Sequence, residues 1–77
     1  MKEEIGFLKA STHRFRILEF LKKEDANIEK ISKKLRMRKN DAEKTLKELE
    51  KKKLVKKENS IYRITEKGQK IIMEAKK

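Results

Sequence analysis

The stretch NIEKISKKLRMRKNDAEKTLKELEKKK, residues 27–53, decides the fold. Its first part carries apolar residues at spacings of three and four, at Ile28, Ile31 and Leu35, which is the pattern of a short amphipathic helix. Asn27 comes directly before them and is a preferred N-cap residue, because its side-chain oxygen can accept a backbone N–H of the first turn. The stretch therefore predicts a helix that begins just after Asn27.

A second helix is predicted in the same stretch. Asn40 with Glu43 three residues later forms a pattern like a capping box, with Asn in place of Ser or Thr, so we expect the helix to open at Asn40 and to run to about residue 53. Its spacing indicates a buried face made of Ala42, Leu46 and Leu49. Met37 should fill the corner between the two helices.

The preceding and following segments predict the rest of a small core. Residues 11–24 contain a broad apolar stripe that favours a helix, with Ser11 or Thr12 as its N-cap. Residues 54–58 and 61–65 flank Asn59-Ser60, a two-residue linker of the kind that closes a β-hairpin. In that register Glu58 faces Ile61 and Lys56 faces Arg63.

A last helix should follow the hairpin, with Thr65 as its N-cap. One face of this helix is lined by Gly68, Ile71, Ile72 and Ala75. Residues 1–10 are too short to predict a helix, and we expect them to pack on the core or on a second subunit.

The composition points to an anionic partner. The 77 residues hold 24 lysines and arginines against 13 acids, a net charge of +11, and residues 29–58 alone have an excess of seven positive charges. Such a field favours nucleic acid or an anionic surface. Charged residues make up 48% of the chain, mostly lysine and glutamate, which is a thermophile-like bias.

Other classes of function are disfavoured by the sequence. There is no cysteine and one histidine, so no metal site is predicted, and neither a phosphate loop nor a nucleophile with a base is present. We therefore expect no enzyme activity and no cofactor. No window approaches the roughly 18 apolar residues of a membrane span, so we expect no membrane association and a cytoplasmic location.

The segments STHRFRILEFL, NIEKISKKLRMRKNDAEKTLKELEKKKLV and YRITEKGQKII, in this order around a hairpin, resemble the small winged helix-turn-helix transcriptional regulators of archaea and bacteria. The resemblance covers Ser11 to Ile72. The length of the chain predicts one domain, residues 1–77. The segments predict a fold that is mainly α with a small β-hairpin, in the order helix, helix, helix, hairpin, helix, and the resemblance implies that this is a winged helix-turn-helix.

The resemblance also implies a recognition helix at residues 41–53 and a wing at residues 56–63. The solvent-facing positions of the family's recognition helix fall on Lys39, Asn40, Asp41, Lys44, Thr45, Lys47 and Lys51. Where the family often has glycine, this chain has Arg36 and Lys53, so each should adopt a left-handed backbone conformation or the helix ends should differ.

We predict duplex DNA as the partner. Near the bases we expect Asn40, Asp41, Lys44 and Thr45, because the first turn of a recognition helix enters the major groove most deeply. The complete set of predicted DNA-binding residues is Arg36, Arg38, Lys39, Asn40, Lys44, Thr45, Lys47, Lys51, Lys56, Lys57 and Arg63.

The sequence leaves three functions open. The first is a transcriptional regulator, the second an architectural DNA-binding protein without sequence preference, and the third a winged-helix module that binds an acidic protein. Apolar residues beyond the apparent needs of the core suggest a homodimer through the N-terminal segment or the C-terminal helix. These residues are Ile5, Phe7, Leu8, Ile72, Met73 and Ala75.

Overall fold

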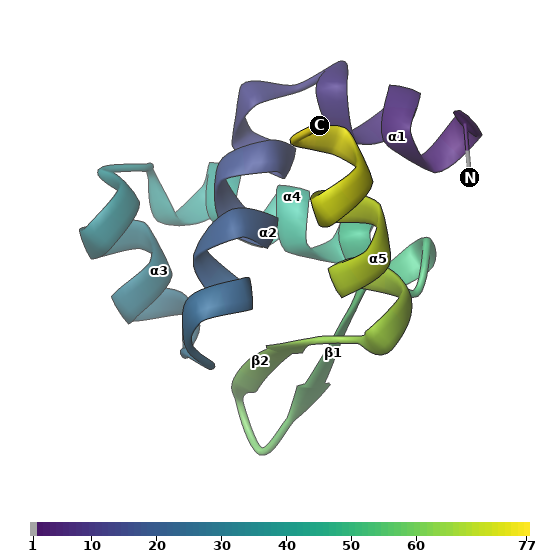
Figure 1. Ribbon diagram of the computed structural model, residues 1–77. Coiled ribbons are helices and arrows are strands. Elements are labelled where there is room, and N and C mark those ends of the chain that lie inside the picture. The colour runs from purple at the N-terminus through teal and green to yellow at the C-terminus, as the bar shows by residue number, and fades with distance from the viewer. Residues whose placement is uncertain (1) are drawn as a thin grey trace.

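The computed structural model describes residues 2–77 and shows a mainly α fold with one β-hairpin in a winged-helix arrangement, as the sequence predicts (Figure 1). Met1, the first residue of the predicted domain, lies outside the described residues. The elements in chain order are α1 (Lys2–Lys9), α2 (Thr12–Lys23), α3 (Ile28–Leu35), α4 (Lys39–Lys51), β1 (Val55–Glu58), β2 (Ile61–Ile64) and α5 (Glu66–Ala75).

Three of the predicted helix caps are confirmed. The Ser11 hydroxyl accepts the backbone N–H of Arg14 at the start of α2, at 3.4 Å. Asn27 Oδ1 accepts the N–H of Lys30 at 2.8 Å, and Thr65 Oγ1 accepts the N–H of Gly68 at 3.0 Å. Each cap satisfies one of the backbone donors that the first turn of a helix leaves without an intrahelical partner.

The predicted cap at Asn40 is wrong. The helix α4 begins at Lys39, and its N-cap is Arg38, which has an extended backbone and makes no side-chain cap hydrogen bond. Asn40 is therefore the second residue of the helix, where its side chain is exposed to solvent. The turn between α3 and α4 is shorter than the sequence suggested, since it spans only residues 36–38.

The helices α3 and α4 end in the same way. The N–H of Met37 donates to the Ser32 carbonyl at 2.9 Å, and the N–H of Leu54 donates to the Leu49 carbonyl at 3.0 Å. These bonds are those of a Schellman motif, which requires a left-handed residue one position earlier. Arg36, with φ 54°, and Lys53, with φ 61°, take that conformation, which is the first of the two outcomes that the sequence left open.

The core lies between the helices, and the predicted buried faces are confirmed. Met37 fills the corner between α3 and α4 with 7% of its surface exposed. The largest side chains with less than 2% exposed are Leu8, Ile17, Leu18, Leu21, Ile31, Leu46, Leu49, Leu54, Ile71 and Ile72. Every element except the hairpin strands contributes to this list, so the core holds all five described helices together.

Residues 2–9 form a helix that the sequence did not predict. Leu8 is fully buried, and α1 packs on α5 and α2 at the end of the molecule opposite the hairpin (Figure 1). Ile5 and Phe7 pack partly buried against the core. A helix of eight residues is marginal in water, so this tertiary contact is what makes it stable.

The apolar residues that suggested a homodimer are mostly used within the chain. Leu8, Ile72 and Ala75 belong to the core, and Ile5 and Phe7 pack against it. Within residues 2–77, the exposed large apolar side chains are Met73, at 55%, and Ile61, at 36%. The homodimer therefore stays a prediction without the apolar surplus on which it was based.

The β-hairpin has the predicted register, with Lys56 opposite Arg63 and Glu58 opposite Ile61. Asn59 and Ser60 both have positive φ values, 49° and 69°, as a two-residue turn of type I′ requires. The hairpin is also tied to the loop before α3. Ala26 exchanges two backbone hydrogen bonds with Tyr62, at 3.2 and 2.8 Å, so the wing is fixed relative to the helix pair α3 and α4.

Candidate nucleic-acid interface

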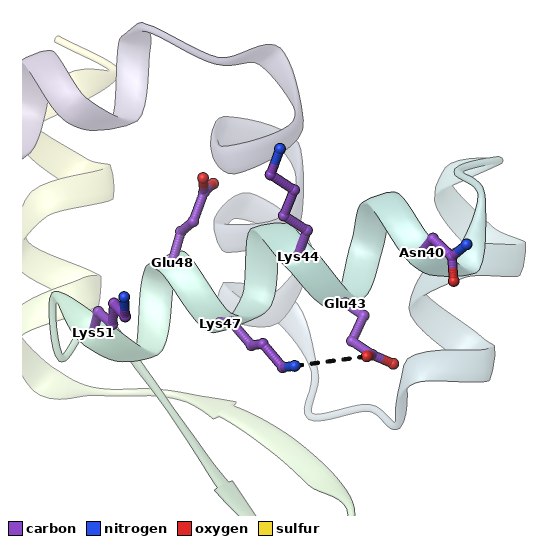
Figure 2. A pocket seen from close by; sticks show the side chains of 6 residues that line it. All are labelled: Asn40, Glu43, Lys44, Lys47, Glu48 and Lys51. Atoms are coloured by element: carbon purple, nitrogen blue, oxygen red, sulfur yellow. Dashed lines mark ion pairs between the residues drawn. The ribbon is translucent and has the colours of Figure 1, made fainter.

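The helix α4 presents one polar stripe to solvent. Asn40, Lys44, Lys47 and Lys51 follow at spacings of four, three and four residues, which places them on one side of a helix with 100° per residue. We call this stripe the α4 ridge. The opposite side of α4 is buried. Together with Glu43 and Glu48, the ridge residues line a shallow open groove along the outer side of α4 (Figure 2).

Thr45 does not belong to this surface, contrary to prediction. Only 5% of its surface is exposed, so it cannot reach a base from the solvent side of the helix. Thr45 lies three residues after Ala42 and four before Leu49, and both of these are fully buried. The same spacing was visible in the sequence and would have placed Thr45 on the buried face.

Two arginines stand at the N-terminal end of the α4 ridge. Arg36 and Arg38 are exposed, while Met37 between them is buried. We call Arg36 and Arg38 the corner arginines. Within residues 2–77, neither makes an ion pair, and Lys44 and Lys51 on the ridge make none either. These four cations are therefore available to an external anion.

The end of α3, directly before the corner arginines, is held by α2. Arg16 Nη2 donates to the carbonyl of Leu35 at 2.9 Å and so satisfies one of the last carbonyl groups of α3. Ser32 in α3 donates its hydroxyl to the carbonyl of Met37. These bonds fix the corner backbone on which the two arginines are carried.

Carboxylates lie on both sides of the α4 ridge. Glu43 Oε1 is 3.8 Å from Lys47 Nζ, so Lys47 is partly neutralised (Figure 2). On the other side, Glu48 Oε1 accepts Arg14 Nε at 3.2 Å. This hydrogen bond, with further help from the charges of Lys44 and Lys51, lowers the pKa of Glu48 below its ordinary value. The ridge is therefore positive, but it is not uniformly basic.

Lys39 is exposed but engaged in an ion pair. Its Nζ lies 2.9 Å from Glu29 Oε2, which joins the start of α4 to the first turn of α3. The hydrogen bond to Glu29 raises the pKa of Lys39, and the same bond lowers the pKa of Glu29. An external phosphate would compete with Glu29 for this lysine.

The three predicted cations of the hairpin lie on two different faces of it. Lys57 shares a face with Tyr62 and lies 5.6 Å from the centre of the Tyr62 ring. It lines a groove between the hairpin and α4, together with Lys47. Three acids also line that groove, namely Glu29, Glu43 and Glu50.

Lys56 and Arg63 are on the opposite face, because side chains alternate along a strand. Arg63 Nε lies 2.9 Å from Asp25 Oδ2, and Arg63 Nη1 lies 3.4 Å from Glu58 Oε1. These contacts raise the pKa of Arg63 above its ordinary value. Lys56 Nζ lies 3.7 Å from the same Glu58. Lys56 and Arg63 therefore do not extend the α4 ridge, and both are engaged within the chain.

The comparisons with known proteins identify the family. Residues 2–77 match the family described as the HVO_A0261 N-terminal domain. The chain belongs to this family. No curated protein and no solved structure matches the chain. The description of the HVO_A0261 N-terminal domain family names no ligand.

The residues that the structure describes contain neither a membrane-spanning helix nor a metal-binding cluster. None of the helices formed by residues 2–77 is both long enough and apolar enough to cross a membrane. In the same residues, no three or more histidine, aspartate or glutamate side chains are grouped so that they could hold a metal ion.

Proposed function

We propose that this member of the HVO_A0261 N-terminal domain family binds duplex DNA through α4 and acts as a transcriptional regulator. The observation that carries the proposal is the set of exposed cations at the N-terminal half of α4, which make no ion pair within residues 2–77. Arg36 and Arg38 stand at the corner and Lys44 follows on the ridge. A net charge of +11 supports long-range attraction to a polyanion.

The dimensions of α4 suit the major groove. Its 13 residues make a helix about 20 Å long, and the groove of B-DNA admits a helix of ordinary diameter. In helix-turn-helix docking, the first turns of the second helix approach the base edges most closely. Asn40 can then bind adenine through two hydrogen bonds and Lys44 can donate to guanine, while the corner arginines bind phosphates.

The hairpin should contribute less than α4. Lys56 and Arg63 are engaged by Glu58 and Asp25, so a phosphate would first have to displace those carboxylates. Lys57 faces the groove toward α4, where acidic side chains also lie. We therefore expect backbone contact near Lys57 at most, and no deep reading of the minor groove by the hairpin.

A second candidate, an architectural DNA-binding protein, is favoured by one specific observation. With Thr45 buried, three of the four residues of the α4 ridge are lysines, and Asn40 is the ridge residue that carries both a donor and an acceptor. Phosphate contacts position a protein on DNA but carry no direct sequence information. Affinity with little sequence preference is the expected behaviour of such a surface.

The first experiment measures binding of a fluorescently labelled mixed-sequence duplex over a range of salt concentrations. Arg38→Ala and Lys44→Ala should each weaken binding and lower the slope of log K against log salt by about 0.9 for each lost phosphate contact. Lys70→Ala removes the same charge from α5 and serves as the control. If Arg38→Ala and Lys44→Ala are both folded and bind the duplex like wild type at low salt, α4 is not the contact surface.

The second experiment separates the candidate functions. Selection from a pool of random duplexes should enrich a motif if the protein is a regulator with sequence preference. Enrichment of no motif, with tight binding to the pool, supports the architectural protein. Negligible binding of any duplex at physiological salt would instead favour the winged-helix module that binds an acidic protein.

A further inference from the structure

One acid on the outer side of α4 is held by a residue from another helix. Arg14, in the first turn of α2, donates from Nε to Glu48 Oε1 at 3.2 Å. These two residues are 34 positions apart in the sequence. Arg14 is absent from the residues predicted to bind DNA, because nothing in its local sequence connects it to α4.

Arg14 is itself fixed by α1. Its Nη1 donates to the carbonyl of Phe7 at 2.8 Å, and its guanidinium group lies over the Phe7 ring at 4.0 Å. The side chain is 21% exposed. A planar guanidinium group that is stacked on a ring and bound on two nitrogens has one orientation, so Arg14 has little freedom to turn toward an external phosphate.

Glu48 lies where its charge matters for DNA binding. It comes four residues after Lys44 and three before Lys51, and the side chains of Lys44 and Glu48 point away from the same side of α4 (Figure 2). Its side chain is 33% exposed. A glutamate carboxylate is charged at neutral pH. Without a partner, a carboxylate at this place would repel the phosphates that the two lysines attract.

We propose that Arg14 is a positioning residue for the α4 ridge. It holds the Glu48 carboxylate toward α2 and compensates its charge, so that Lys44 and Lys51 meet the DNA backbone without an uncompensated acid between them. Phe7 acts one step further away, because it orients Arg14. This makes α1 part of the DNA-binding apparatus, and the inference rests on the proposed function.

The test is a cycle of Arg14→Gln, Glu48→Gln and the double variant, each titrated with the labelled mixed-sequence duplex. Arg14→Gln should weaken binding about fivefold, since a unit charge within a few ångströms of another in water has an effect of this order. Glu48→Gln should not weaken binding. In the double variant the affinity should return to that of Glu48→Gln, because the carboxylate that Arg14 compensates is gone.

Two other roles of Arg14 give different results. If Arg14 contacts phosphate directly, Arg14→Gln weakens binding equally in the wild-type and the Glu48→Gln backgrounds, and the salt slope falls by about 0.9 in both; this overturns the inference. If Arg14 only supports the fold, Arg14→Gln lowers the melting temperature and the helical circular dichroism, and Glu48→Gln does not restore binding. That result also overturns it.

Two further variants act as matched probes. Arg16→Gln removes the same charge two residues along α2, where the side chain binds the carbonyl of Leu35, and Glu48→Gln should not restore any affinity that it loses. Phe7→Leu keeps apolar bulk but removes the ring under Arg14, and it should weaken binding less than Arg14→Gln and in the same direction.

The results also separate the inference from the proposed function. If wild type binds the duplex and Arg38→Ala weakens it, while Arg14→Gln binds like wild type, the function stands and the role of Arg14 is overturned. If wild type binds no duplex, the proposed function is overturned first, and the role of Arg14 in DNA binding with it.

Discussion

Gly68 in α5 lies against the backbone of Leu54, the residue that closes the turn after α4. A Cβ atom at Gly68 would stand 2.2 Å from the Leu54 carbonyl oxygen and 2.8 Å from Cγ1 of Ile64. The same carbonyl accepts the backbone N–H of Thr65 at 3.0 Å, so it is not free to move away. The close approach of α5 to the end of α4 therefore depends on the absence of a side chain at this position.

Gly68→Ala should lower the free energy of unfolding by about 1–3 kcal/mol, because the added methyl group must push α5 away from the turn. Gly6→Ala is the matched control. Gly6 is also helical, and nothing lies within 4 Å of an added Cβ, so that change should stabilise the protein by about 0.5–1 kcal/mol. Urea denaturation of both variants measures the two effects. Equal effects of the two substitutions would contradict the packing seen at Gly68.

The two asparagines of residues 27–53 should behave differently. Asn27→Ala removes a side-chain cap at 2.8 Å and should destabilise the protein by about 1 kcal/mol. Asn40→Ala should leave stability nearly unchanged, because Asn40 is the exposed second residue of α4 and caps nothing. Thermal unfolding of the two variants compares these effects. A loss of stability for Asn40→Ala as large as that for Asn27→Ala would indicate that Asn40 caps α4, as the sequence predicted.

This contrast shows how far the sequence could predict the fold. The sequence indicated Asn27 and Thr65 as caps, and either Ser11 or Thr12, because a cap is a local interaction: a polar residue stands directly before a run of apolar residues at helical spacing. The hairpin register was equally local, since the two residues Asn59-Ser60 determine it. A left-handed backbone at Arg36 and Lys53 was one of two expected outcomes, because the family that the chain resembles often has glycine there. These features depend on residues that are neighbours in the sequence, although the capping pattern at Asn40 was equally local and was wrong.

The errors have physical reasons too. Residues 2–9 become helical through contact with α2 and α5, which no short window can show. Asn40 matches a capping pattern, but α4 begins one residue earlier, at Lys39, so Asn40 lies within the helix and does not cap it. For the candidate site, charge indicated residues 29–58, but charge does not show which cations are already engaged in ion pairs within the chain. The partners of Arg63 and Lys56 lie in the three-dimensional fold, as does the contact between Arg14 and Glu48.

The stability of the protein should decrease in acid through paired carboxylates. Hydrogen bonds from Arg14 and Lys39 lower the pKa of Glu48 and of Glu29 below the ordinary value of 4.5. A carboxyl with a depressed pKa in the folded state stabilises the fold above its unfolded-state pKa, and this contribution is lost as the pH falls through the folded-state pKa. The free energy of unfolding should therefore decrease below about pH 4.5.

The contribution of Glu48 can be isolated by substitution. Glu48→Gln removes the titrating group, so the loss of stability below about pH 4.5 should be less steep than in wild type. Arg14→Gln should reduce the steepness in a similar way, because the carboxyl then has no partner that depresses its pKa. Urea denaturation at a series of pH values provides the curves. Curves of identical shape for wild type and both variants would show that this pair does not stabilise the fold.

Glycine substitutions at the two left-handed positions should separate stability from DNA binding. Arg36, with φ 54°, and Lys53, with φ 61°, hold equivalent places at the ends of α3 and α4. Arg36→Gly and Lys53→Gly should each raise the free energy of unfolding by about 0.5–1 kcal/mol, because glycine adopts this conformation without steric cost.

Only Arg36→Gly removes a corner arginine, so it alone should weaken binding to the mixed-sequence duplex severalfold and lower the salt slope. Lys52→Gly, at φ −85°, is the control for stability and should bring no gain. Equal loss of DNA affinity at both left-handed positions would mean that the end of α4 contacts DNA as closely as its beginning, against the docking proposed for this helix.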